Sequence, residues 1–248
     1  IRRILDDQLF ELVEIKDPTV RALKLINAEI DIIQNDLPLE LINYLTQQSD
    51  ISHQLTKGVN VSYIGFNFMD PLLGNHNFRM ALAMSIDRAL ITKYFFNAKT
   101  RIADQILPPE HWASHNIKGV EYNPNKAREI LSKLSPDRKI NLTYKTSTDP
   151  FRLKIATIIQ AQLAEVGIDL SIKTLDWGTY FQDIQSGNFQ LYGLTWVGIR
   201  SPEIYEKIFS SDFIPPKGLN RGKYSDLSMD LYINRAKINN DWSPVVLE

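Results

Sequence analysis

The histidines are the residues of this chain whose chemistry can be judged most directly from their spacing. A metal site needs three or four ligands that meet at one point. Only His111 and His115 have helical spacing, and they lie in a stretch, residues 97–123, whose sequence predicts irregular structure. His53 and His76 are far from this pair along the chain. We therefore expect no metal site and no cofactor.

Asp87 and Asp176 are acids that stand on or beside apolar segments. Neither belongs to a recognisable pairing of acid, base and nucleophile. Because a buried carboxylate needs a partner cation, we expect Asp87 to form a structural ion pair with Arg79 or Arg88. The chain contains no cysteine, no glycine-rich phosphate loop and no G-x-S-x-G or H-E-x-x-H sequence. We therefore expect that this protein is not an enzyme.

Three aromatic residues, Trp177, Tyr180 and Phe181, stand close together along the chain. Their spacing of three and four residues is typical of the buried face of a helix. We expect them to belong to the hydrophobic core rather than to a surface that stacks on a ligand.

Composition limits the class of protein. The 248 residues are 44% hydrophobic and 23% charged, which is ordinary for a globular chain. A formal net charge of −1 lacks the basic excess that nucleic acids favour, so we expect no nucleic-acid partner. No apolar run approaches the roughly 18 residues of a membrane span. The chain begins at Ile1 rather than at methionine, and we interpret it as a piece of a longer protein.

Strand and helix patterns alternate along the chain and predict an α/β architecture with helices covering the faces of a sheet. Helix starts are indicated where Asp or Asn precedes proline, as at Asp17-Pro18, Asn123-Pro124 and Asp149-Pro150. The predicted strands cover residues 4–15, 30–33, 51–55, 61–68, 140–145, 168–175 and 189–197. The predicted helices cover residues 17–27, 78–96, 124–131, 149–164, 176–186 and 202–209, with others beginning at Pro38 and lying within 224–238.

The segment from Phe78 to Phe96 contains no glycine or proline and predicts one uninterrupted helix. Phe78, Leu82, Ile86 and Ala89 fall on one face of it, and apolar residues also occupy the other faces. We therefore expect this helix to be covered on most sides.

This helix carries a resemblance to a known family. The sequence NFRMALAMSIDRALI, residues 77–91, resembles the RVRQALAYAIDREAII element of the bacterial extracellular solute-binding proteins of family 5, which serve peptide, dipeptide and nickel ABC importers. The sequences YNPNKAREIL, residues 122–131, and IATIIQAQLAEVGIDLSIKTLDW, residues 155–177, resemble later elements of the same family in the same order. The resemblance extends over nearly the whole chain, but over only about half of a full-length family member.

The resemblance implies an α/β fold of the type II periplasmic-binding-protein kind, with a mixed sheet flanked by helices. In such proteins two lobes close over a ligand about a hinge. Residues 1–60 would be the tail of the first lobe, made of a strand–helix–strand unit and a helix. Residues 61–248 would be the second, ligand-facing lobe, incomplete at its C-terminus.

The same resemblance implies where the ligand binds. The sequence FQLYGLTWVGIRSPEIY, residues 189–205, is similar to the family's strand and loop that pair with the backbone of a peptide. The ligand-binding residues would be Trp196, Val197, Gly198, Ile199 and Arg200. Peptide binders carry an acid after this tryptophan that neutralises the α-ammonium group, and here Ile199 holds its position. Because an uncompensated ammonium group is costly to desolvate, N-blocked peptides, anionic groups or a nickel chelate become better candidates.

The resemblance implies a substrate-binding component of an ABC importer, which captures a peptide or peptide-like solute between two lobes and delivers it to the membrane permease. Its partners would be the solute and the permease subunits, and we expect a monomer in the periplasm or anchored outside the cytoplasmic membrane. Two alternatives stay open: the ligand-sensing domain of a transcription regulator, and a binder of a nickel chelate or other non-peptide solute.

Overall fold

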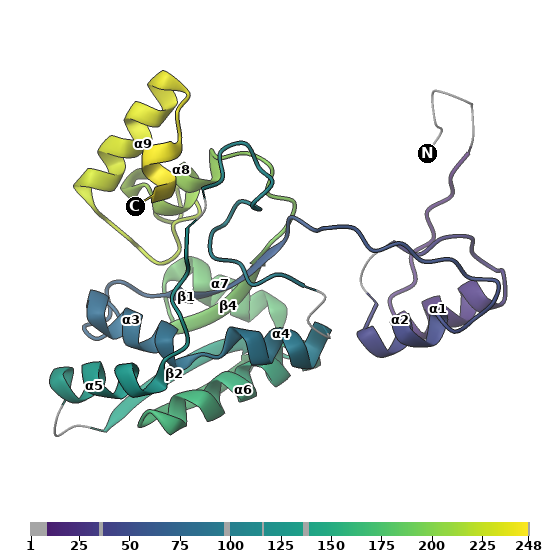
Figure 1. The fold of residues 1–248 in the computed structure, drawn as a ribbon, viewed down its shortest axis with the longest axis horizontal. Coiled ribbons are helices and arrows are strands. Elements are labelled where there is room, and N and C mark those ends of the chain that lie inside the picture. The colour runs from purple at the N-terminus through teal and green to yellow at the C-terminus, as the bar shows by residue number, and fades with distance from the viewer. Residues whose placement is uncertain (1–8, 35–36, 97–99, 116, 136–138, 248) are drawn as a thin grey trace. The chain divides into compact units, whose positions relative to one another are not determined.

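The alternating pattern of strands and helices predicts an α/β fold, and the computed structural model of this chain has one (Figure 1). It describes residues 9–34, 37–96, 100–115, 117–135 and 139–247. Contacts divide the chain into two compact units, Ile1–Lys57 and Gly58–Glu248. The assignment of residues 1–60 and 61–248 to two different lobes stays a prediction.

The first unit contains the two predicted helices, α1 (Pro18–Ile26) and α2 (Leu39–Leu45). The Asp17 carboxylate accepts a hydrogen bond of 2.9 Å from the backbone N–H of Val20 and caps α1, as the Asp-Pro sequence predicts. A local signal at the helix end therefore determines where α1 begins.

The strand predictions for the first unit are wrong for the residues that the structure describes. Residues 4–8 of the first predicted strand lie outside the described residues. Residues 10–15, 30–33 and 51–55 form no strand, and only Leu9 makes a single bridge. Their apolar side chains are largely exposed, including Leu12, Ile32 and Leu55. An alternating sequence becomes a strand only when a neighbour supplies hydrogen-bond partners and a surface to cover, and the described part of this unit provides neither.

The second unit is built on a mixed four-stranded sheet in the order β1-β4-β2-β3. The strands are β1 (Val61–Phe66), β2 (Ile140–Ser147), β3 (Ile168–Leu175) and β4 (Leu191–Trp196). β4 runs antiparallel to β1 along its whole length, and β2 runs parallel to both β3 and β4. All four strands were predicted from sequence, with β1 and β4 shorter than expected.

Helices cover both faces of this sheet (Figure 1). On one face α3 (His76–Ser85), α5 (Pro124–Leu134) and α6 (Pro150–Glu165) form the main core, where Phe78, Leu82 and Leu163 are buried. On the other face α7 (Trp177–Ser186) packs Tyr180 and Ile184 against β4.

A further core forms between the C-terminal elements and the irregular segment that contains Leu107 and Ala113. Its elements are α8 (Ile204–Phe209), the short 3₁₀ helix Ser211–Phe213, α9 (Leu227–Asn239) and α10 (Ser243–Leu247). No helix in the described ranges combines the length and apolar character of a membrane span.

The helix predicted from Phe78 to Phe96 is two helices, because the chain breaks at Ile86 and restarts as α4 (Arg88–Phe96). Ile86 is extended, with φ −104° and ψ 111°. The Asp87 carboxylate accepts a hydrogen bond of 2.9 Å from the Leu90 N–H, and the Asp87 N–H donates one of 3.1 Å to the Gln162 side chain. Asp87 therefore starts a new helix, and α4 has no buried residue, contrary to the expected cover on most sides.

The predicted ion pair of Asp87 is also wrong for the described residues. Arg88 pairs instead with Asp104, at 3.0 Å. Arg79 donates hydrogen bonds of 2.9 Å to the carbonyls of Leu73 and Gly74. The carboxylate of Asp87 thus serves as a helix cap rather than as a counter-ion.

Replacement of Asp87 tests this role. Asp87→Ala should lower the free energy of unfolding by about 1 kcal/mol, the usual cost of a lost helix cap. Asp87→Asn should lower it much less, because asparagine caps helices as well. Urea unfolding measures both. A loss above about 3 kcal/mol for either variant would indicate a buried ion pair and contradict the cap.

Candidate functional site

The loop that the resemblance selects, residues 196–200, is held at the end of β4 by two other segments. The Gly198 N–H donates a hydrogen bond of 2.9 Å to the side chain of Asn60, which directly precedes β1. A ring nitrogen of His111 lies 3.1 Å from the carbonyl oxygen of Arg200. Gly198 has a φ of +70°, a conformation that favours glycine, so the turn after Trp196 depends on this residue.

The structure places the five predicted site residues in two environments. Trp196 and Ile199 are half-buried and pack against the C-terminal core. Val197, Gly198 and Arg200 are exposed, Val197 to 72% of its surface. Ligand contact by these residues stays a prediction.

Sequence reasoning missed Tyr63 and Arg221 as neighbours of Trp196. The rings of Tyr63 and Trp196 are stacked, with centroids 5.6 Å apart and planes at 8°. The Arg221 guanidinium lies 4.9 Å from the centre of the Trp196 ring and 5.5 Å from that of Phe181, and its Nη1 donates a hydrogen bond of 3.3 Å to the Tyr63 hydroxyl. No local pattern links Arg221 to residues so distant in sequence, because the fold alone brings them together.

The core assignment of Trp177, Tyr180 and Phe181 is confirmed only for Tyr180, which is fully buried. It is wrong for Trp177, which is 53% exposed, and Phe181 is half-buried. The guanidinium of Arg152 lies 5.9 Å from the centre of the Trp177 ring. Aromatic rings on this side of the sheet therefore carry arginine side chains on their faces.

The backbone of β4 has one unpaired side near its end. The Asn67 N–H donates a hydrogen bond to the Gln190 carbonyl, one residue beyond the paired part of β1 and β4. In an antiparallel pair, alternate residues direct their N–H and C=O groups to the same side. The even-numbered residues of β4 therefore direct these groups toward β1, and the odd-numbered residues direct theirs to the opposite side. On that other side β2 pairs with β4 only at Leu191 and Tyr192. We call the unpaired side of residues 193–196 the free edge of β4.

The first carbonyl on the free edge, that of Gly193, is occupied by side chains. It accepts a hydrogen bond of 2.6 Å from the Tyr180 hydroxyl and one of 3.3 Å from Nη1 of Arg152. The next residue that faces the same way is Thr195, and no strand of the described part of the chain pairs with it there. A backbone N–H and C=O of Thr195 are therefore directed toward the space beside β4.

Tyrosine hydroxyls surround this edge and stay protonated. Burial raises the pKa of Tyr180 to about 12 and also raises the pKa of Tyr63. The positive charge of Arg152 partly offsets the effect on Tyr180, and that of Arg221 partly offsets the effect on Tyr63. Arginine side chains thus lie close to two of these hydroxyl groups.

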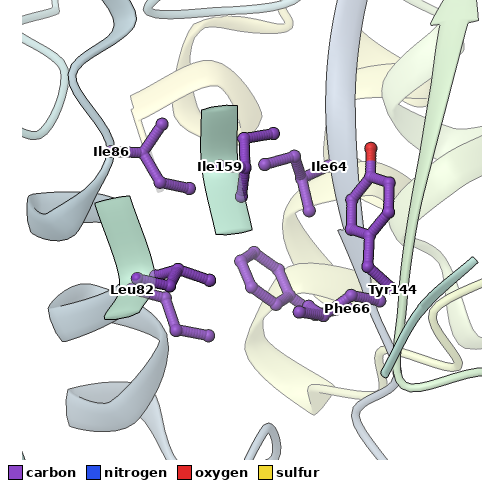
Figure 2. A pocket seen from close by; sticks show the side chains of 8 residues that line it. Ile64, Phe66, Leu82, Ile86, Tyr144 and Ile159 are labelled. Carbon is purple, nitrogen blue, oxygen red and sulfur yellow. The ribbon is translucent and has the colours of Figure 1, made fainter. Parts of the chain in front are cut away.

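Two hollows in the second unit do not include the predicted loop. One is a void of about 10 Å³ within the main core, between β1 and the helices α3 and α6 (Figure 2). Its walls are almost entirely apolar, and it is too small to hold a solute. The other, of about 340 Å³, lies where α4 begins and is lined mainly by residues 86–89 and 118–122.

Metal-ligating side chains do not gather within the residues described, where no group of three or more His, Cys, Asp or Glu could hold an ion. His111 uses its two ring nitrogens on the Ala113 N–H and the Arg200 carbonyl.

Known structures share this architecture. A periplasmic binding protein, DppA from Helicobacter pylori in complex with the peptide STSA, matches with a TM-score of 0.80 at 24% identity, over 94% of this chain and 46% of that one. NikZ from Campylobacter jejuni in complex with Ni(L-His) matches with a TM-score of 0.75 at 20% identity, over 94% of this chain and 50% of that one. The fold is therefore that of a type II periplasmic binding protein.

The chain belongs to the bacterial extracellular solute-binding proteins, family 5, whose model for the middle region matches residues 9–211. A di/tripeptide-binding protein of Pseudomonas aeruginosa is 26% identical over 233 residues, which is 91% of this chain and 43% of that protein. The chain thus spans less than half the length of the curated relatives it matches.

The pKa of Tyr180 predicts how stability changes at alkaline pH. An unfolded tyrosine titrates near pH 10, so the folded state keeps a proton that the unfolded state loses between pH ~10 and ~12, and stability should fall over this range. Tyr180→Phe should make the fall shallower, and below pH 10 it should cost about 1 kcal/mol for the lost hydrogen bond to Gly193. Urea unfolding at a series of pH values measures both effects.

Tyr94→Phe is the matched control, since the Tyr94 side chain is 69% exposed and its loss should leave the pH dependence unchanged. If Tyr180→Phe and Tyr94→Phe show the same alkaline slope as the parent chain, Tyr180 does not titrate as its burial requires.

Proposed function

We propose that this chain is part of the substrate-binding component of an ABC importer and holds a peptide or peptide-like solute. The observation that carries the proposal is the free edge of β4, which ends at the loop of residues 196–200. A peptide in extended conformation would add to this edge as a strand and bond to the backbone groups of Thr195. Such bonds involve only main-chain groups, so they accept peptides of different sequence.

Family membership supports this role, as does the similarity to a di/tripeptide-binding protein. We propose further that residues 61–248 are the ligand-facing lobe, and that residues 1–60 belong to the tail of the other. The two lobes would close over the solute, since burial of 70–90% of a ligand requires walls on both sides. The complete protein would act as a monomer outside the cytoplasmic membrane and pass the solute to a permease without chemical change.

The loop residues have separate parts in this proposal. Gly198 would let the chain turn away at the end of the edge, and Trp196 would support the aromatic side of the site. Val197 and Arg200 would face the solute, because both are exposed. Ile199 packs against the C-terminal core and would shape the loop rather than bind an ammonium group.

A scan with N-methylated peptides tests strand addition. A methyl group on a backbone nitrogen removes a donor, and in a strand only alternate residues direct their donors to the same neighbour. Methylation of the nitrogens of a tetra-alanine peptide one at a time should therefore weaken binding about tenfold at the position that donates to the Thr195 carbonyl and little at its two neighbours. Titrations followed by NMR, which detects weak complexes, give the dissociation constants.

The unmethylated peptide is the control for each position. Equal tolerance of methylation at every position would contradict strand addition. Absence of binding by the unmethylated peptide in a protein that contains both lobes would contradict the proposed function itself.

A further inference from the structure

Arg221 is a half-buried cation held between two aromatic rings. Its guanidinium lies 4.9 Å from the centre of the Trp196 ring and 5.5 Å from that of Phe181. These contacts, with the hydrogen bond to the Tyr63 hydroxyl, fix the plane of the guanidinium before any ligand arrives. A fixed guanidinium loses little conformational entropy when it binds, which favours tight recognition.

This cation has no counter-ion in the described part of the chain. No carboxylate there lies within ion-pair distance of Arg221, Arg152 or Arg200. The ion pairs that this unit does form involve other residues, and most of them join exposed side chains, such as those of Lys126 and Glu129. A guanidinium has five N–H donors, and among the described residues Arg221 donates one side-chain hydrogen bond, to the Tyr63 hydroxyl. None of its nitrogens is a buried atom without a partner, so the remaining donors face solvent.

The unpaired arginines stand at both ends of the free edge of β4. Arg152 donates to the carbonyl of Gly193, where the edge begins. Arg221 lies on Trp196, where the edge ends, and Arg200 follows in the loop. A solute that extends along this edge would therefore meet arginine side chains at each end.

We propose that Arg221 binds a carboxylate group of the solute and that the site therefore selects acidic peptides over neutral or basic ones. This inference rests on the proposed function, because it names the charge class of the peptide held at the free edge. The planar fork of a guanidinium matches the two oxygens of a carboxylate and forms paired, charge-assisted hydrogen bonds with it. Partial burial between two rings shields this contact from water and strengthens it.

The carboxylate has two possible sources, an acidic side chain or the C-terminus of the peptide. Three tripeptides separate them: Ala-Glu-Ala blocked at both ends, Ala-Ala-Ala blocked only at its N-terminus, and Ala-Ala-Ala blocked at both ends. Blocked Ala-Lys-Ala adds the opposite charge. NMR titrations follow the indole N–H signals of Trp177 and Trp196, two of the four tryptophans, and detect weak binding to the 248-residue chain.

At least one of the two carboxylate peptides should bind about tenfold more tightly than fully blocked Ala-Ala-Ala, and the lysine peptide should bind most weakly. The advantage should shrink as salt is added. Arg221→Met, which keeps the length and apolar contacts of the side chain, should abolish most of the advantage. Arg221→Lys keeps the charge without the planar fork and should retain part of it.

Arg235→Met is the matched control, since Arg235 is exposed on α9 and its loss changes the net charge equally. If Arg221→Met and Arg235→Met change the affinity for the acidic peptides equally, or if all four peptides bind alike, the role of Arg221 is wrong while peptide binding stands. If none of the peptides binds a protein that contains both lobes, the proposed function fails first, and the inference fails with it. Should Arg221→Met not fold, Arg221→Lys decides: unchanged affinity for every peptide would overturn the role of the guanidinium.

Discussion

The carbonyl group of Gly193 is the point on which the rest of the site depends. Up to Tyr192, β4 is paired on both sides, and after it the strand keeps only β1. The Tyr180 hydroxyl and Arg152 satisfy this carbonyl, which would otherwise be left without its ladder partner. Because those two donors come from α7 and α6, helices on both faces of the sheet stabilise the end of the pairing between β2 and β4. The next outward-facing residue, Thr195, is left available.

Small residues allow the tyrosines to lie across the strands at this point. A Cβ atom on Gly193 would lie 2.0 Å from the Tyr144 hydroxyl oxygen, and one on Gly65 would lie 2.2 Å from the ring of Tyr192. Both rings therefore require glycine opposite them. The resulting layer of rings and arginines beside β4 is aromatic and carries positive charge. Ile199 packs against the C-terminal core and does not belong to this layer.

Much of the fold follows from local signals in the sequence, and the errors have physical causes. Asp-Pro and Asn-Pro pairs gave the starts of α1, α5 and α6 correctly, because capping involves neighbouring residues only. The break at Ile86 had a local signal, a capping residue at Asp87, but the Gln162 side chain that supports it comes from a distant helix. Alternation at residues 9–15 predicted a strand that the described residues do not form, because pairing depends on a neighbour. No role could be predicted for Arg221 from the sequence, since the two aromatic rings that it contacts belong to β4 and α7.

Hydrogen exchange at the backbone amides of β4 tests whether the solute adds to this strand. A saturating peptide should slow exchange at Thr195, whose N–H lies on the free edge. Exchange at Leu194 and Trp196, whose N–H groups face β1, should change far less, so these neighbours serve as internal controls. If the peptide saturates the protein and the Thr195 amide exchanges as fast as before, the solute does not add to β4 as a strand.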